Sequence, residues 1–161
     1  MAFYRLLSPY CGFFAIFAIQ KSQNTNKMKI TEEILDELTE QAKASPRLRM
    51  NYDLRNSPED QSQRMLNALE PGTILPIHRH QKTSEINICI RGHFEEYLYD
   101  QNGNLIETID MVPGGTVLKI EAGQWHNLKC LESGTVLFEC KDGAYKPLEE
   151  EDIYSKAEDN L

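Results

Sequence analysis

The fold is decided by the stretch Gly72-Thr-Ile-Leu-Pro-Ile-His78-Arg-His80-Gln-Lys-Thr-Ser-Glu85, which is followed by Gly92. His78 and His80 are two residues apart, so on an extended strand their side chains leave from the same face. Glu85 lies far enough along the chain to come from the next strand, across a tight turn. Two imidazoles and a carboxylate placed in this way can hold one metal ion.

A second stretch brings a third histidine toward the same point. It runs Gly115-Thr-Val-Leu-Lys-Ile-Glu-Ala-Gly123-Gln-Trp-His126 and again follows a turn-then-strand pattern. Three imidazoles and one carboxylate leave one or two positions free on an octahedral ion, which is typical of a catalytic rather than a structural site. The sequence therefore predicts one divalent transition ion, Fe, Mn, Ni or Zn, held by His78, His80, Glu85 and His126.

These two stretches resemble the two motifs of the cupin superfamily. The first matches Gly-x5-His-x-His-x4-Glu-x6-Gly at every fixed position, and the second matches at its glycines and at its histidine. Glu121 stands where cupins usually carry proline and Cys130 where they often carry asparagine, but neither is a ligand position. The resemblance implies an all-β fold, the double-stranded β-helix or cupin jelly roll.

A narrower resemblance, over residues 28–145, is to the cupin-fold metalloproteins of the WbuC family. It rests on Ser45-Pro-Arg-Leu-Arg-Met-Asn51, Gln63-Arg-Met-Leu-Asn-Ala-Leu-Glu-Pro-Gly72 and Gly134-Thr-Val-Leu-Phe-Glu139. It implies a bacterial single-domain metal-binding protein of the kind often associated with surface-polysaccharide synthesis. It implies no known reaction.

The rest of the chain fits one barrel with a short N-terminal helical segment. Turn signals recur at short intervals from Met65 onward, and Asn102-Gly103 between two strand-like runs is a strong hairpin signal. Ile34, Leu35, Leu38 and Ala42 predict an amphipathic helix over residues 31–44 that covers one side of the barrel.

We expect four segments along the chain. Residues 1–27 are an extension outside the working domain, residues 28–64 a helical or extended cover, residues 65–148 the cupin barrel, and residues 149–161 an acidic, solvated tail. The extension leaves the location open: a misplaced start implies a cytoplasmic protein, whereas residues 1–19 acting as a signal segment imply export, and a third alternative is an interaction segment. Four cysteines without a CxxC pair favour free thiols in a reducing compartment.

Composition limits the partners. The chain has 161 residues, 40% of them apolar, which suits one domain with one core. Residues 1–27 hold three basic groups and no acidic ones, so the remainder carries 14 basic against 25 acidic groups. That acidity excludes nucleic acid and anionic membrane as partners of the folded domain and leaves a small-molecule ligand.

The run from Ser84 to Arg91 alternates strictly between polar and apolar residues. If Glu85 points inward, Asn87 and Cys89 follow it, and three isoleucines at 86, 88 and 90 point outward. An apolar outer face needs a cover, which the helix or a second subunit would supply. We therefore expect a homodimer.

Two classes of function remain open. One is a small metalloenzyme, an isomerase, hydrolase or iron-dependent dioxygenase, acting on a sugar or other polar metabolite with Asn87 or Tyr97 assisting proton transfer. The other is a non-catalytic metal-containing sensor or binding module. Five further side chains have weaker signals. His93 lacks a motif offset, Trp125 fits core packing, and Arg79, Lys82 and Arg91 could receive an anion.

Overall fold

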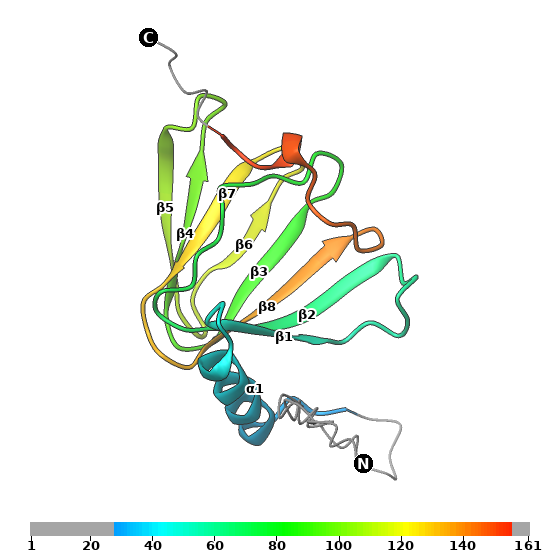
Figure 1. Cartoon of the computed structure of the whole chain (residues 1–161), viewed down its shortest axis with the longest axis vertical. Coiled ribbons are helices and arrows are strands. Elements are labelled where there is room, and N and C mark those ends of the chain that lie inside the picture. The colour runs from blue at the N-terminus through cyan, green and yellow to red at the C-terminus, as the bar shows by residue number, and fades with distance from the viewer. Residues whose placement is uncertain (1–27, 156–161) are drawn as a thin grey trace, which may run out of the picture.

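The computed structural model describes residues 28–155 as a double-sheet jelly roll (Figure 1). One sheet has the strand order β1-β2-β8-β3-β6 and the other β5-β4-β7, and every pairing is antiparallel. The elements in chain order are α1 (Glu32–Ala44), β1 (Arg49–Asp53), β2 (Ser62–Leu69), β3 (Glu85–Arg91), β4 (Phe94–Tyr99), β5 (Leu105–Met111), β6 (Val117–Ile120), β7 (Trp125–Cys130), β8 (Thr135–Asp142) and the 3-10 turn η1 (Glu150–Asp152). The predicted all-β fold with a short N-terminal helix is confirmed.

The space between the two sheets divides into an apolar end and a polar end. At the end near α1, the last residues of β2, β3, β5 and β7 meet the first residues of β4 and β8 (Figure 1). Burial of these side chains closes that end of the barrel. The buried core there consists of Leu69, Cys89, Phe94, Met111, Cys130 and Leu137. The opposite end, where β3 and β7 begin, is left to polar groups.

Gly92 makes the turn from β3 into β4. Its φ is +81°, and a Cβ placed on it would lie 2.3 Å from Oγ1 and 2.7 Å from Cα of Thr135. Only glycine tolerates both the left-handed backbone and the contact. The motif glycine therefore fixes the hairpin that sets β3, and with it Glu85, against the neighbouring strands.

Helix α1 covers the outer face of β1, β2 and β8. Leu35, Leu38 and Ala42 pack on Leu66 and Val136, all nearly fully buried. The helix starts after Thr31, although the threonine side chain makes no capping hydrogen bond.

A guanidinium on β3 fastens the helix to the barrel. Arg91 Nη1 lies 2.7 Å from an Asp36 oxygen, and Arg91 Nη2 donates to Thr39 Oγ1 at 3.0 Å. The helix therefore occupies the covering position expected for it.

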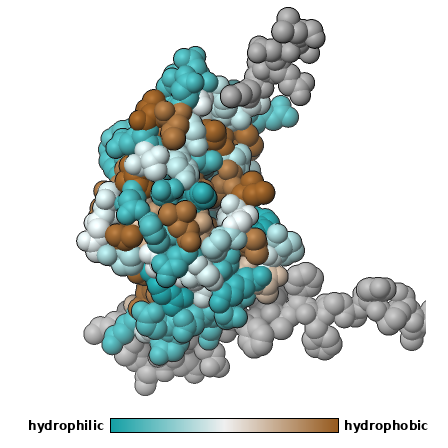
Figure 2. Space-filling view, turned by 90° about the vertical axis from the view of Figure 1, so that its left-hand side faces the viewer, coloured by the Kyte–Doolittle hydropathy of each residue, from teal (hydrophilic) through white to brown (hydrophobic). Residues whose placement is uncertain are grey.

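The alternation along β3 is as predicted, but the helix does not cover all of its outer face. Glu85, Asn87 and Cys89 are buried, whereas Ile86 and Ile90 remain 37% and 38% exposed. Of the two covers expected for this face, a helix or a second subunit, α1 does not cover Ile86 and Ile90, because the helix lies over other strands of the sheet. On the face that lies at the left in Figure 1, apolar residues form separate patches among polar ones (Figure 2).

Two segments outside residues 65–148 pair with the barrel. The five-stranded sheet starts with β1 at Arg49, before residue 65, because β1 pairs with the whole second half of β2. In the expected solvated tail, Ile153 forms an antiparallel bridge with His78. The predictions for residues 1–27 lie outside the described residues. Within residues 28–155, no helix is long and apolar enough to cross a membrane.

Candidate metal centre

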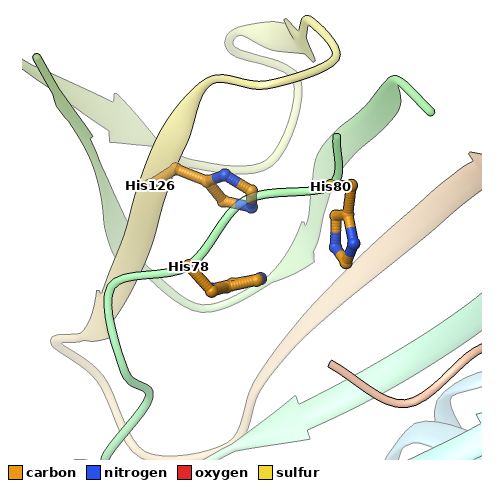
Figure 3. Close-up of side chains that lie close together, drawn as sticks. All are labelled: His78, His80 and His126. Atoms are coloured by element: carbon orange, nitrogen blue, oxygen red, sulfur yellow. The ribbon is translucent and has the colours of Figure 1, made fainter. Parts of the chain in front are cut away.

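Three histidine rings converge at the polar end of the barrel (Figure 3). His126 comes from β7, and the other two come from the extended segment before β3. Ring centroids lie 4.3 Å apart for His78 and His126 and 5.2 Å apart for His78 and His80. One ligand atom from each ring lies within 4.8 Å of the others. The segment forms no regular strand, since only His78 makes a ladder bridge to His126.

Backbone hydrogen bonds hold that segment on both edges. On one edge the amides and carbonyls of His78 and His126 exchange bonds of 2.9 and 2.8 Å. On the other edge Arg79 N donates to Asp152 O at 3.0 Å and Tyr154 N to Ile77 O at 2.8 Å. We call residues 150–154 the C-terminal strap. The histidine segment is thus clamped between β7 and the strap.

An aromatic stack reinforces the clamp from outside. The Arg79 guanidinium carbon lies 4.4 Å from the Trp125 ring centroid, and Tyr154 packs edge-on against the same ring at 5.5 Å. A cation over an indole face is favourable, and here it turns the arginine away from the histidines. Trp125 is buried and packs on the face of β7 opposite His126, against Arg79 and Tyr154 and not in either apolar core cluster.

The backbone also selects which ring nitrogens are free. His78 Nδ1 lies 3.1 Å from Pro76 O, and His126 Nδ1 lies 2.9 Å from Gln124 O. A carbonyl only accepts, so in each neutral ring Nδ1 carries the proton and Nε2 keeps its lone pair. Such backbone partners are what orient metal-ligating histidines.

The buried Nε2 of His126 has no hydrogen-bond partner. Glu85 Oε1 approaches it to 3.1 Å, but without the alignment of a hydrogen bond. Burying an unsatisfied polar atom is costly. A cation between His126, Glu85 and the other two rings would remove that cost, so the residues present fit a transition metal ion.

Glu85 is 5% exposed and lies among these imidazoles. Its Oε2 is 3.4 Å from His80 Nε2. Burial acts to raise the pKa of Glu85, but His126 and His80 outweigh it and hold the pKa well below its usual value. The carboxylate is therefore ionised and available as a ligand.

The imidazoles of His78 and His126 differ in proton affinity. Burial lowers the pKa of His78 to about 4. Burial also acts to lower the pKa of His126, but Glu85 outweighs it and the pKa is raised. His78 is thus neutral and ready to ligate at neutral pH, whereas an incoming cation must compete with a proton for His126.

Lys141 lies at the edge of the cluster. Its ammonium is 3.1 Å from His80 Nε2 and 3.6 Å from Glu139 Oε1. A cation bound by His80 would repel the ammonium, and Glu139 offers it an alternative partner.

A cavity of about 440 Å³ opens from the histidines into the barrel. Such a volume lies within the range of small-molecule sites. Its walls include the carboxyl groups of Glu96, which is buried, and Glu139, which is half-buried. Burial, followed by the neighbouring Glu85, raises the pKa of Glu139, and burial raises the pKa of Glu96 to about 8. The cavity is therefore a polar chamber beside the candidate ligands.

Of the two predicted catalytic candidates, Asn87 lies in the cavity and Tyr97 does not. Asn87 is 3% exposed and its amide nitrogen donates to Glu85 at 3.2 Å. The prediction that Tyr97 faces the interior is wrong. Its hydroxyl donates to Glu95 on the outer face of β4, and that bond raises the pKa of Tyr97 to about 12.

The group that sequence reasoning missed is Glu96. It is 1% exposed, and Asn87 Nδ2 lies 3.5 Å from Glu96 Oε2. The signal was present, because Glu96 shares the inward face of β4 with Phe94 and Leu98. Choosing the correct face of β4 requires its pairing with β7, which sets Leu98 opposite His126.

The remaining candidates lie away from the cavity. His93 contacts Asp110 on β5. Arg79 is stacked on Trp125, and Arg91 holds helix α1. Lys82 is exposed in the turn before β3.

Solved structures of similar fold include three bacterial proteins. KdgF from Halomonas sp. has a TM-score of 0.50 at 16% identity, covering 62% of this chain and 82% of KdgF. The capsular polysaccharide assembling protein CapF from Staphylococcus aureus has a TM-score of 0.53 at 20% identity, covering 65% of this chain and 30% of CapF. A deletion mutant of Bacillus subtilis oxalate decarboxylase has a TM-score of 0.50 at 22% identity, covering 62% of this chain and 26% of the decarboxylase.

These likenesses confirm the predicted cupin fold, and at such identities they show the fold alone. The chain spans less than a third of CapF and of oxalate decarboxylase. No curated protein matches the sequence. The sequence profile of a family described as a domain of unknown function, DUF6016, matches residues 30–111.

Proposed function

This chain belongs to the DUF6016 family, and from its histidine cluster we propose that it is a metal-dependent enzyme acting on a small polar metabolite. The observation that carries the proposal is the convergence of three imidazoles, with Glu85 beside them, on the wall of a 440 Å³ cavity. In this proposal one divalent ion, Fe, Mn, Ni or Zn, is held by His78, His80, Glu85 and His126. When bound, the ion supplies Lewis acidity to a substrate oxygen.

Glu96 favours an enzyme over a sensor. A carboxyl group with a pKa of about 8 keeps its proton at neutral pH. Such a group can donate a proton to substrate and later take it back. A cation at the histidines would lower this pKa toward neutrality, where proton exchange is most effective. A non-catalytic binding module has no need of a buried, protonated acid in its chamber.

The proposed division of labour uses residues of this chain for each role. Glu96 exchanges the proton, and Asn87 orients it, because the asparagine amide lies between Glu96 and Glu85. Asn87 Oδ1 is buried without a hydrogen-bond partner, so it remains free to accept from a substrate hydroxyl. Proton transfer of this kind fits isomerisation or hydrolysis.

Metal analysis combined with a metabolite screen tests the proposal. We expect Glu96→Gln to retain its metal and to lose turnover by at least about a hundredfold. Glu95→Gln, one residue away on the outer face of β4, is the matched control and should keep full turnover. Turnover that needs oxygen would instead support the iron-dependent dioxygenase. Metal without turnover of any metabolite, with ligand binding unchanged in Glu96→Gln, would support the sensor.

The substrate class, the biological role and the cellular location are also proposals. The resemblance to WbuC proteins supports a sugar substrate and a bacterial role in surface-polysaccharide synthesis, so nucleotide sugars belong in the metabolite screen. In the described part of the chain Cys89, Cys130 and Cys140 are free thiols, which supports a cytoplasmic location.

We also propose a homodimer through the outer face of β3 and β6. Val117, on β6, is 63% exposed beside the half-exposed isoleucines at 86 and 90. Light scattering should give a dimer mass, and Ile86→Glu should shift it toward the monomer, since a buried unpaired charge opposes association. A monomeric wild-type protein would end this part of the proposal.

A further inference from the structure

Arg47 and Arg49 line the same cavity as the histidines. No ion pair is formed by either arginine within residues 28–155. Of the other arginine and lysine side chains of the wall, only the exposed Lys146 is also without an ion pair in the described part of the chain. Arg55 is held by Asp53 at 2.7 Å, and Lys141 lies beside Glu139. The two arginines are thus uncompensated positive charges in a chain whose formal net charge is −8.

Arg49 lines the cavity and makes a single side-chain hydrogen bond. Its side chain makes one long hydrogen bond, from Nη1 to Ile74 O at 3.4 Å, although a guanidinium carries five N–H donors. It is half-buried, and burial followed by the charge of Arg47 lowers its pKa. Edge strands often carry charges to block strand pairing, but such charges face solvent rather than a chamber.

The backbone between the two arginines adopts a disfavoured conformation. Leu48 has φ of +55°, in the left-handed region that leucine rarely enters. Hydrogen bonds from Glu70 N at 2.9 Å and Thr73 Oγ1 at 2.6 Å anchor its carbonyl. Strain of this kind persists only where the surroundings fix it, and it accumulates at ligand sites. Here it sets Arg49 at the head of β1, facing the cavity.

The arginines lie within reach of the candidate ligands. Ile74, which Arg49 contacts, is four residues before His78, and four extended residues span at most about 14 Å. One small molecule can therefore touch the arginines and the histidines together. We propose that Arg47 and Arg49 bind the anionic oxygens, carboxylate or phosphate, of the small-molecule ligand whose other end reaches the histidines. This inference rests on the proposed function, for which it names the substrate class.

Nuclear magnetic resonance titration of the full-length protein tests the inference, with inorganic phosphate and acetate as separate probes at constant ionic strength. We expect saturable shifts of the Arg49 side-chain N–H and of the backbone amides around it. Arg49→Gln should weaken binding about tenfold, since it removes a charge-assisted hydrogen-bond donor. The more exposed Arg47 should contribute about threefold. A response to one probe alone identifies the group as phosphate or carboxylate.

Arg55→Gln is the matched control, because it removes the same charge from the same cavity but from a guanidinium already paired with Asp53. It should leave the anion affinity unchanged. Equal losses in Arg55→Gln and Arg49→Gln would overturn the inference by reducing it to net charge. It would also be overturned if neither probe gave saturable shifts, or if binding persisted undiminished in Arg49→Gln.

Two measurements keep the outcomes separate. Should Arg49→Gln fold poorly, Arg49→Lys keeps the charge without the planar fork and should show a smaller loss of affinity. Metal content, measured on the same samples, should be unchanged in every arginine variant. Wild-type protein that holds metal but binds neither anion defeats only this inference, whereas wild-type protein that binds anion at the arginines but no metal defeats only the proposed metal site.

Discussion

The histidine end of the cavity lacks a positive partner, whereas its arginine rim, formed by Arg47 and Arg49, lacks a negative one. At the histidine end, backbone carbonyls fix the ring nitrogens, a carboxylate stands beside them, and the buried His126 Nε2 has no hydrogen-bond partner. At the rim, two guanidiniums face the chamber without a carboxylate of their own. The histidine end is built for a cation and the rim for an anion. The comparison teaches that one ligand, bridging a metal and the arginines, would satisfy both.

The strongest way to break this comparison is to remove a histidine. His126→Ala should lower metal affinity by at least about a hundredfold, because it deletes the ring whose Nε2 has no other partner. His93→Ala is the control, since that ring contacts Asp110 away from the cluster. Metal content after dialysis reports both. Equal losses in the two variants would show that the cluster is not the site.

The protonated acid of the chamber can be tested through stability. The pKa of Glu96 is about 8 in the folded protein and near 4.5 when exposed, so the folded state holds the proton more tightly. Stability from this group is therefore present below about pH 4.5 and is lost as the pH rises through 8.

Glu96→Gln has no such loss. In metal-free protein, its advantage in free energy of unfolding over wild type should grow by up to ~4 kcal/mol between pH 4.5 and 8. Denaturant unfolding at the two pH values measures it, with Glu95→Gln as control. An advantage that stays constant with pH would mean that Glu96 ionises freely in the chamber.

Removing the C-terminal strap should loosen the histidine end. Ending the chain at Leu148 removes the hydrogen bonds that Asp152 O and Tyr154 N make with residues 77–79. Metal affinity should fall about tenfold, as it does when partners that orient ligands are lost. Ending the chain at Ser155 keeps these bonds and serves as the control. Unchanged affinity after the longer deletion would show that β7 alone positions the histidines.

The smallest effect is expected at the other terminus. A chain that begins at Met28 keeps α1, both sheets and every cavity residue, so it should fold and bind metal like the full-length protein. Insolubility of this shorter chain would show that residues 1–27 belong to the working domain.

The features that could be predicted from the sequence are those that depend on the two-residue repeat of an extended chain. The two-residue spacing of His78 and His80, and the alternation from Glu85 to Ile90, assign side chains to faces because a strand repeats every two residues. Tyr97 and Glu96 show the limit of that rule. Alternation says that they face opposite ways, but which one faces inward depends on the pairing of β4 with β7.

Contacts between distant segments were beyond the sequence pattern. The acidic run before Ile153 looks like a solvated tail, yet the strap binds free backbone groups of residues 77–79 that exist only once the barrel has formed. The arginine rim could not be predicted for the same reason, because the role proposed for Arg47 and Arg49 depends on their lining the same cavity as His78. Such features arise from tertiary geometry and not from local propensity.

Metal analysis of purified full-length protein, never exposed to chelator, tests the central claim most directly. Elemental mass spectrometry on wild type and His126→Ala in parallel would give the ratio of metal to protein. The account predicts about one transition ion per wild-type chain and almost none in the variant. Wild-type protein without stoichiometric Fe, Mn, Ni or Zn, even after incubation with these ions, would contradict it and leave only the fold.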